Sequence, residues 1–191
     1  MNEAALLVID VQDSFKRRPS WAQRSFAHTF EPAVTRLIAA FRDAGRPVIY
    51  VMHSDGDEAF AFDGPDYRLM SFLDRRDDEP IIHKTTANAL TSTPLLPLLL
   101  ARGIRRLVVT GIQTEQCCET TSRVAADLGF AVDFVTEATM TFPIAENADG
   151  TGRILSTQDI IERTEFALRR RFARIATVDD VVREVREPVA V

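Results

Sequence analysis

The sequence of 191 residues predicts an α/β fold of three layers (α/β/α), with a six-stranded parallel sheet between two layers of helices. Short apolar runs alternate along the chain with segments whose apolar residues recur at helical spacing. Several of these runs are continuous rather than alternating, which is typical of strands that are buried on both faces. No linker or internal repeat divides the chain, so we expect a single domain over residues 1–191.

The first half of the chain supplies three of the predicted strands. Ala4–Ile9 is a continuous apolar run, and Pro32–Ala44 has helical spacing that a glycine closes. Two more strands are expected at Pro47–Met52 and Pro80–Ile82. The segment between them, Ser54–Asp78, is polar, acidic and aromatic by turns and has no period. We therefore expect a long loop there, and long loops in compact domains are usually functional.

The second half continues the alternation of strands and helices. Ser156, with Asp159 three residues later, forms a loose capping-box pattern that predicts a helix start. The expected elements are, in order, a helix Leu95–Ala101, a strand Ile104–Val109, a helix Glu115–Leu128, a strand Ala131–Val135, a polar loop Ile144–Arg153, a helix Ser156–Arg171, a strand Arg174–Ala176 and a helix Val178–Val185.

Composition excludes several classes of protein. Hydrophobic residues make up 46%, which supplies a sizeable core. With 23 basic and 28 acidic residues and no basic block, nucleic acid is not an expected partner. The N-terminus has no basic region of a signal peptide, and no apolar run reaches the ~18 residues of a membrane span. The two cysteines are neighbours and form no disulfide framework, so we expect a cytoplasmic protein.

The stretch Leu107–Arg123 carries a candidate nucleophile. It predicts a strand, a tight turn at Gly111, and a helix with Thr114 as its N-cap and Cys117 in its first turn. Free N–H groups and the helix dipole favour an anion there, so we expect a favoured thiolate at Cys117. The same N–H groups suit the oxyanion of acyl transfer. The alternative is a small buried hydrophobic cysteine.

Two further polar residues follow neighbouring strands. Asp10 comes after the first strand and Lys84 after the third, and the carboxyl ends of parallel strands form the ligand-binding edge of such a sheet. A carboxylate accepts a thiol proton, and an ammonium stabilises both the carboxylate and a thiolate. We expect Asp10, Lys84 and Cys117 to meet at the sheet edge, with Asp10 and Lys84 outside the core. Taken singly, Asp10 as a turn cap and Lys84 as a surface residue remain alternatives.

Four motifs carry a resemblance to a known family: LLVIDVQDSF, IIHKTTANAL, VVTGIQTEQCCETT and EATMTF (Glu137–Phe142). In this order and spacing, the chain resembles the isochorismatase-like cysteine hydrolases, which include nicotinamidases and N-carbamoylsarcosine amidohydrolases. The resemblance implies a Rossmann-like fold, a catalytic triad of Asp10, Lys84 and Cys117, and no cofactor. It also implies a cis peptide bond between Ile112 and Gln113, and an oxyanion hole formed by the N–H groups of Gln113 and Cys117.

The chain departs from its relatives in three places. In nicotinamidases, a D-x-H-x-x-H motif after the second strand forms a metal site. The corresponding loop of this chain holds His53 and no second histidine. We expect no metal, and we expect His53 to be a hydrogen-bonding residue at a strand end. Asn88-Ala89-Leu90 replaces the common Ser-Ala-Phe. Cys118 stands where a small apolar residue is usual, which favours a packed helix residue over a redox role.

The function expected from these features is hydrolysis of a small amide-type (C–N) substrate through a thioester. Gln12 is expected to orient Asp10 or the substrate. Aromatic residues of the loops either line the pocket mouth or pack within the loops: Phe15, Trp21, Phe60, Phe62 and Tyr67. Alternatives are vinyl ether hydrolysis of the isochorismatase type and a catalytically silent ligand-binding or partner domain. A dinucleotide enzyme is disfavoured because DVQDSF lacks G-x-G-x-x-G.

The expected partners are a small-molecule substrate and further copies of the chain. The family resemblance implies a homo-oligomer, either a dimer or a tetramer. The run Leu95–Leu100 (LLPLLL) offers more apolar surface than one sheet face requires. Part of this helix is therefore expected to meet a partner chain.

Overall fold

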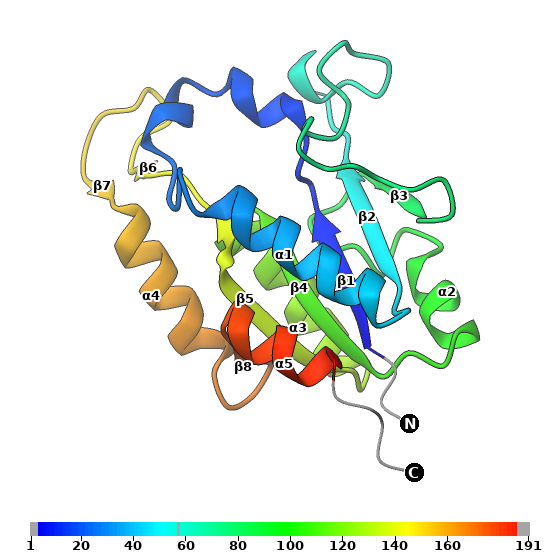
Figure 1. The fold of residues 1–191 in the computed structure, drawn as a ribbon. Helices are drawn as coiled ribbons and strands as arrows, with labels where there is room; N and C mark the ends of the chain where they lie inside the picture. The colour runs from blue at the N-terminus through cyan, green and yellow to red at the C-terminus, as the bar shows by residue number, and fades with distance from the viewer. Residues whose placement is uncertain (1–3, 57, 187–191) are drawn as a thin grey trace.

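The computed structural model describes residues 4–56 and 58–186, and it confirms the predicted α/β fold. Its main sheet has six parallel strands in the order β3-β2-β1-β4-β5-β8. The strands are β1 (Ala4–Ile9), β2 (Val48–His53), β3 (Ile81–Lys84), β4 (Arg106–Ile112), β5 (Ala131–Met140) and β8 (Arg174–Ile175). The chain order reverses at β1, which lies between β2 and β4 at the centre of the sheet (Figure 1).

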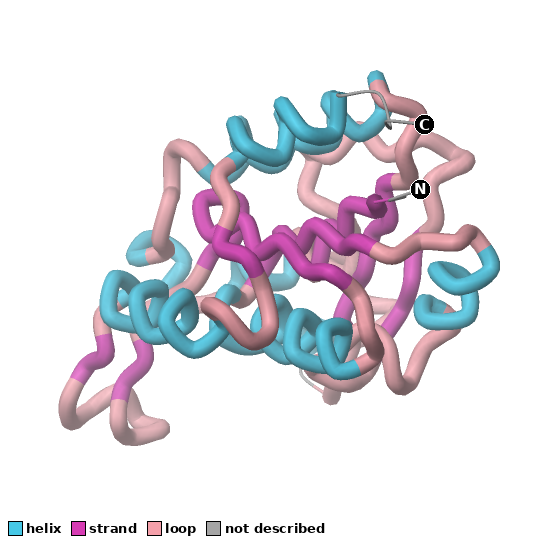
Figure 2. Tube along the Cα trace, turned by 90° about the horizontal axis from the view of Figure 1, so that it is seen from below, coloured by secondary structure: helices cyan, strands magenta, loops and turns pink. Residues whose placement is uncertain are grey.

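Helices cover both faces of the sheet, as Figure 2 shows. They are α1 (Phe30–Asp43), α2 (Leu95–Ala101), α3 (Glu119–Asp127), α4 (Thr157–Leu168) and α5 (Val178–Arg186). Helices α1 and α5 pack side by side on one face, while α2 and α3 bury their apolar residues on the other. None of the helices in the described part of the chain has the length and apolar character needed to cross a membrane.

Strand β1 shows why its sequence is apolar at every position. Leu6 and Val8 belong to the core beneath α1 and α5, whereas Leu7 and Ile9 belong to the core on the α2 and α3 side. All four side chains are fully buried. A central strand that is covered on both faces cannot alternate between apolar and polar residues, which explains the continuous run in the sequence.

Loops and short helices cover the carboxyl ends of the strands. Short 3₁₀ helices at Asp13–Arg17 and Pro19–Gln23 follow β1, and a third, Glu58–Phe60, lies in the long segment between β2 and β3. These segments lie above the sheet in Figure 1. They also touch one another, because Gln12 pairs with Leu69 in an isolated antiparallel bridge. The long segment expected to be functional therefore lies over the sheet edge where the candidate residues are.

Three strand predictions need correction. Strand β4 includes Gly111 and ends at Ile112, so the predicted end at Val109 and the predicted tight turn at Gly111 are wrong. Strand β5 continues to Met140, five residues past the predicted end at Val135, because an irregularity shifts its register against β4 between Val109 and Gly111 and lets pairing resume. The predicted polar loop Ile144–Arg153 contains strand β6 (Ile144–Ala145) and the connection to β7 (Ile154–Leu155), with which β6 forms a small antiparallel hairpin. Strands of two residues are too short to show a sequence period.

The helix that carries the candidate nucleophile begins irregularly. A π-helical turn, Thr114–Cys118, precedes α3, and Gln113 rather than Thr114 occupies the position before it. The prediction of Thr114 as N-cap is therefore wrong. The Thr114 hydroxyl instead lies 2.8 Å from the Thr139 hydroxyl on β5, which ties the start of this helix to the neighbouring strand. Single π turns of this kind are frequent at functional sites.

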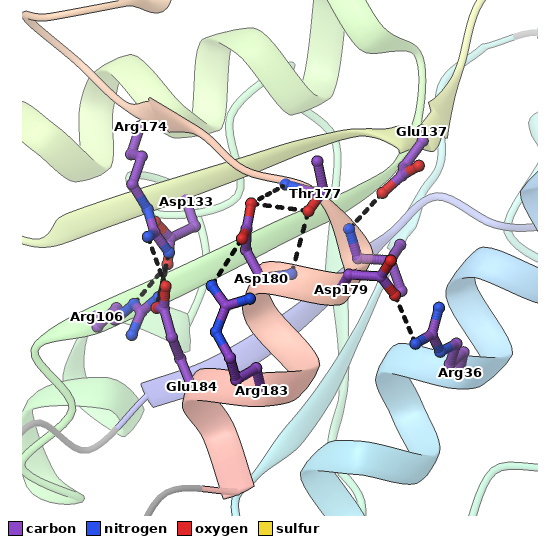
Figure 3. Close-up of polar contacts among 11 residues, drawn as sticks. Arg36, Arg106, Asp133, Glu137, Arg174, Thr177, Asp179, Asp180, Arg183 and Glu184 are labelled. Atoms are coloured by element: carbon purple, nitrogen blue, oxygen red, sulfur yellow. Dashed lines mark hydrogen bonds and ion pairs between the residues drawn. The ribbon is translucent and has the colours of Figure 1, made fainter.

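An ion-pair network fastens the far edge of the sheet at the opposite ends of the strands. Figure 3 shows Arg106 of β4 and Arg174 of β8 converging on Asp133 of β5 and Glu184 of α5. The Arg174 Nε–Asp133 Oδ1 distance is 2.6 Å, and Arg174 lowers the pKa of Glu184 to about 2. Because β8 has only two residues, we attribute its attachment to the sheet largely to these charged contacts.

Candidate active site

The structure brings Asp10, Lys84 and Cys117 together. Asp10 follows β1, Lys84 ends β3, and Cys117 lies in the π turn after β4. The Lys84 Nζ atom is 2.7 Å from Asp10 Oδ2 and 3.3 Å from Cys117 Sγ. The side chains of Asp10 and Lys84 are fully buried. The expectation that they lie outside the core is wrong, because the segments after β1 and β2 cover this edge of the sheet.

Close backbone packing sets this geometry. Ile9 pairs with Gly111, and a Cβ atom at position 111 would stand 1.9 Å from the Ile9 carbonyl oxygen. Only glycine fits there, so the end of β4 approaches the end of β1 directly before each strand delivers its functional residue. Asp10 itself has a φ of 54°, a left-handed conformation that is uncommon for residues other than glycine. The peptide bond between Ile112 and Gln113 is cis.

Burial and charge decide the protonation states of the site. Burial raises the pKa of Asp10 above its usual value, although Lys84 opposes this shift. Burial alone would lower the pKa of Lys84, but Asp10 and Cys117 together raise it. Burial and then the Asp10 carboxylate raise the pKa of Cys117 to about 12, against the effect of Lys84. The expected favoured thiolate is therefore wrong. These shifts favour a thiol at Cys117, beside the Asp10–Lys84 pair whose Oδ2–Nζ distance is 2.7 Å.

This arrangement is suited to general base catalysis. A carboxylate whose pKa is raised is a better proton acceptor than an ordinary aspartate. The protonated thiol becomes a nucleophile when its proton moves to Asp10, and the Lys84 ammonium stabilises the sulfur anion that forms. Burial keeps water away from these charges, so that each electrostatic contact is stronger than it would be at the surface.

His53, at the end of β2, is the fourth member of the cluster. Its Nδ1 atom is 3.2 Å from Lys84 Nζ, and its Nε2 atom is 3.3 Å from Asp55 Oδ2. Burial and then Lys84 lower its pKa, so that the imidazole is neutral at pH 7. His53 is thus a hydrogen-bonding residue at a strand end, as the sequence predicts. The contact between His53 and Lys84, which are more than thirty positions apart, could not be predicted from the sequence.

Gln12 makes its side-chain hydrogen bonds to the backbone of His53 and to Ser14. Its side chain accepts a hydrogen bond from His53 N at 2.8 Å and donates to His53 O at 3.0 Å. Its amide nitrogen also lies 3.0 Å from Ser14 Oγ. Gln12 is fully buried. Its hydrogen-bonding groups therefore hold the backbone of His53. The expected role of Gln12 in orienting Asp10 or the substrate stays a prediction.

The start of the nucleophile helix offers hydrogen-bond donors. The Gln113 N–H group makes no hydrogen bond within residues 4–56 and 58–186. The Gln113 side chain donates to Glu115 Oε1 at 3.0 Å, and Glu115 Oε2 accepts from the Thr141 hydroxyl at 2.6 Å. Burial raises the pKa of Glu115. Sequence reasoning did not single out Glu115, and its place in the first turn beside Cys117 was the signal that could have found it.

The predicted aromatic residues divide into two groups. Phe15 is buried and packs edge-on against Phe60, with ring centroids 4.9 Å apart, so it stabilises the loops over the site. Phe62 is 57% exposed, and its ring lies 5.2 Å from that of Tyr67. Burial and then the charge of Asp10 raise the pKa of Tyr67 to about 12, which places Tyr67 within electrostatic reach of the site. The Tyr67 hydroxyl also lies 2.8 Å from His83 Nδ1.

Trp21 also belongs to the packed group. Its ring centroid lies 6.1 Å from that of Phe142, which itself stacks on Phe15 at 6.0 Å. Trp21 is half-buried, since it lies at the margin of the core beneath α1. Phe15, Trp21 and Phe60 thus belong to one aromatic cluster. Phe62 and Tyr67 are the two residues that remain candidates for the pocket mouth.

We predict that activity is independent of a bound metal. Within the described ranges, no three His, Cys, Asp or Glu side chains stand close enough to hold a metal ion, and the His53 Nδ1 atom faces the Lys84 ammonium. Exhaustive dialysis against a chelator should leave the rate of hydrolysis unchanged. Loss of activity that zinc or manganese restores would contradict this prediction.

Comparison with known proteins relates the chain to a single family. The Isochorismatase domain model matches residues 4–166. The uncharacterized isochorismatase family protein YrdC of Bacillus subtilis is 27% identical over 182 residues, which cover 94% of this chain and 95% of YrdC. Nicotinamidase 3 of Arabidopsis thaliana is 32% identical over 156 residues, which cover 73% of this chain and 74% of the relative.

A solved structure agrees with these sequence relatives. The crystal structure of an isochorismatase-family protein from Chromobacterium violaceum superposes with a TM-score of 0.87 at 28% identity, and the match covers 97% of this chain and 94% of that one. The family model spans most of the chain, and the neighbour shares the whole fold. The chain therefore belongs to the isochorismatase family of hydrolases.

Proposed function

We propose that the protein is a cysteine-dependent hydrolase that cleaves a small amide-type C–N bond through a thioester, with Cys117, Asp10 and Lys84 as its catalytic residues. One observation carries the proposal: the buried Lys84 ammonium lies between a carboxylate at 2.7 Å and a thiol sulfur at 3.3 Å. A nucleophile, a proton acceptor and a cation that stabilises both of their anions are the parts that acyl transfer by a thiol requires. The nicotinamidase relative is consistent with an amide substrate.

The first half of the reaction forms the thioester. Asp10 accepts the thiol proton as Cys117 Sγ attacks the carbonyl carbon of the substrate. The negative charge that develops on the carbonyl oxygen is stabilised by the N–H groups of Gln113 and Cys117. Asp10 then donates its proton to the leaving nitrogen, and the C–N bond breaks to release ammonia or an amine.

The second half hydrolyses the thioester. With its proton gone, Asp10 is a carboxylate again and activates a water molecule for attack on the acyl carbon. The same N–H groups hold the second oxyanion, and the proton on Asp10 returns to the sulfur as the acid product leaves. Lys84 remains protonated throughout, because its raised pKa favours the ammonium form. Phe62 and Tyr67 are proposed to contact the substrate at the mouth. We also propose that the enzyme is cytoplasmic, because Cys117 and Cys118 are both free thiols and reduced thiols are typical of that compartment.

A panel of small amides, with ammonia release as the readout, tests this function. We expect at least one carboxamide or ureido compound to be hydrolysed by the wild-type protein and not by a Cys117→Ala variant. Trapping the acyl group on Cys117 by acid quench and mass spectrometry would identify the thioester. Turnover of a vinyl ether with no amide turned over would favour the isochorismatase-type reaction instead. Ammonia release by the alanine variant would contradict the cysteine mechanism.

We further propose that the protein forms a homo-oligomer, either a dimer or a tetramer. Leu100 of α2 is 52% exposed, although the helix is apolar over most of its length. An exposed leucine on an apolar helix is suited to a contact with a second copy. Light scattering at micromolar concentration should give at least twice the monomer mass of 21.4 kDa. A monomer mass would contradict the proposal.

A further inference from the structure

Within the described residues, three acceptor atoms from three different segments lie close to the Lys84 ammonium group. A lysine ammonium carries three donors and accepts no hydrogen bond. These acceptor atoms are Asp10 Oδ2 at 2.7 Å, Cys117 Sγ at 3.3 Å and His53 Nδ1 at 3.2 Å. Since the Lys84 side chain is fully buried, a donor that lost its partner would not be compensated by bulk water.

We infer that His53 is a positioning residue, which fixes the rotation of the Lys84 ammonium so that the other two N–H bonds point at Asp10 and Cys117. The inference rests on the proposed function, because it assigns a role to His53 in that same reaction. His53 does not contact the substrate in this scheme. It acts through Lys84, and its removal would leave the ammonium free to turn away from the sulfur or the carboxylate.

The tautomer of His53 follows from its two neighbours. Because Lys84 only donates, the Nδ1 atom of His53 has to present its lone pair, and the ring proton has to be on Nε2. Asp55 Oδ2, 3.3 Å from Nε2, is placed to accept a hydrogen bond from that Nε2–H group. The charged groups that act on the ring are Lys84 from β3, Asp10 after β1 and Asp55 after β2. Burial and then Lys84 lower the pKa of His53, in agreement with a neutral ring.

Hydrogen bonds to the backbone of His53 and a ring contact also fix the position of this residue. Gln12 brackets the residue, accepting from its N–H at 2.8 Å and donating to its carbonyl at 3.0 Å. The Phe60 ring packs against the imidazole with centroids 6.1 Å apart. Gln12 follows Asp10 by two positions. Its two hydrogen bonds therefore connect His53, whose Nδ1 faces Lys84, to the segment that carries Asp10. The arrangement fixes one geometry for all three acceptors.

Three histidine variants test the inference. His53→Leu removes the acceptor, His53→Asn keeps an amide oxygen close to the position of Nδ1, and His28→Asn is a matched control at an exposed histidine away from the site. Two readouts are used: the steady-state rate, and the alkylation rate of Cys117 by iodoacetamide, located by mass spectrometry. The second readout requires no known substrate and reports the ability of Asp10 and Lys84 to activate the thiol.

We expect His53→Leu to lower both kcat and the alkylation rate of Cys117 by at least about tenfold with little change in KM, since small misplacements of catalytic groups have effects of this size. His53→Asn should recover most of the loss, and His28→Asn should match the wild type. Equal rates in the leucine variant and the wild type would overturn the inference. Equal losses in the leucine and asparagine variants would also overturn it, because ring packing rather than the acceptor would then matter.

A measurement on the wild-type protein keeps the inference testable even if His53→Leu fails to fold. Nitrogen-15 NMR of the histidine rings, assigned by comparison with His53→Asn, should show a neutral His53 with its proton on Nε2 at pH 7. A proton on Nδ1 would overturn the inference. A wild-type Cys117 that is neither alkylated nor active on any amide would instead remove the proposed function on which it rests, and the two failures are therefore distinguishable.

Discussion

Replacing Cys117 by alanine is expected to reduce amide hydrolysis by about 10⁴-fold or more, as the loss of a nucleophile does in other covalent hydrolases. The sulfur is the atom that Lys84 contacts at 3.3 Å. The other cysteine, Cys118, is fully buried and makes no such contact with Lys84 among the described residues. The rate of ammonia release by purified protein measures the effect. Thermal unfolding of the same sample shows whether the variant is folded.

Cys118→Ala is the matched control. Cys118 is fully buried, and burial raises its pKa well above the usual value, so it remains a neutral packing residue. Removing its sulfur should lower the free energy of unfolding by about 1 kcal/mol, through lost contacts and a small cavity. We expect most of the hydrolytic activity to remain. Full activity in the Cys117 variant, or its loss in the Cys118 variant alone, would contradict the assignment of the nucleophile.

The architecture could be predicted from the sequence because the parallel sheet leaves a strong pattern. Ala4–Ile9 is apolar at every position for the reason that the structure shows, namely burial on both faces. Asp10, Lys84 and Cys117 could be selected because each stands just after, or at, the carboxyl end of a strand. The topology alone then brings them to one edge of the sheet.

Other features depend on contacts between distant segments, and the sequence alone does not encode them in a visible way. The length of β5 depends on an irregular pairing with β4, and the burial of Asp10 and Lys84 depends on loops that fold over the sheet edge. The state of the thiol was predicted incorrectly for the same reason. A helix start favours a thiolate, but burial and the nearby carboxylate have the larger effect on the pKa of Cys117.

Asp10 and Lys84 are expected to act as one unit in catalysis. Asp10→Asn removes the proton acceptor, and Lys84→Met removes the ammonium while it keeps much of the side chain. Each change should lower kcat/KM by at least the ~10²-fold that is typical of lost acid–base catalysis. Without the neighbouring cation, the pKa of Asp10 should rise further. The acid limb of the pH–rate profile should therefore move to higher pH in Lys84→Met.

The same variants should be less stable than the wild type, because both side chains are fully buried. Removing one member leaves an uncompensated charge in the interior, which typically lowers the free energy of unfolding by about 3–5 kcal/mol. The double variant Asp10→Asn/Lys84→Met leaves no charge unpaired, so we expect it to recover part of this loss. Denaturant unfolding of the four proteins measures the coupling in stability.

A double-mutant cycle on activity completes the test. If Asp10 and Lys84 serve the same proton transfer, then the second substitution removes little that the first has not already removed. The double variant should therefore be only slightly slower than the slower single variant, under conditions where all four proteins are folded. Losses that multiply would show that the two residues contribute independently. Lys84 would then have to be assigned to the Cys117 sulfur alone, and the proton acceptor would act without help from its neighbouring ammonium.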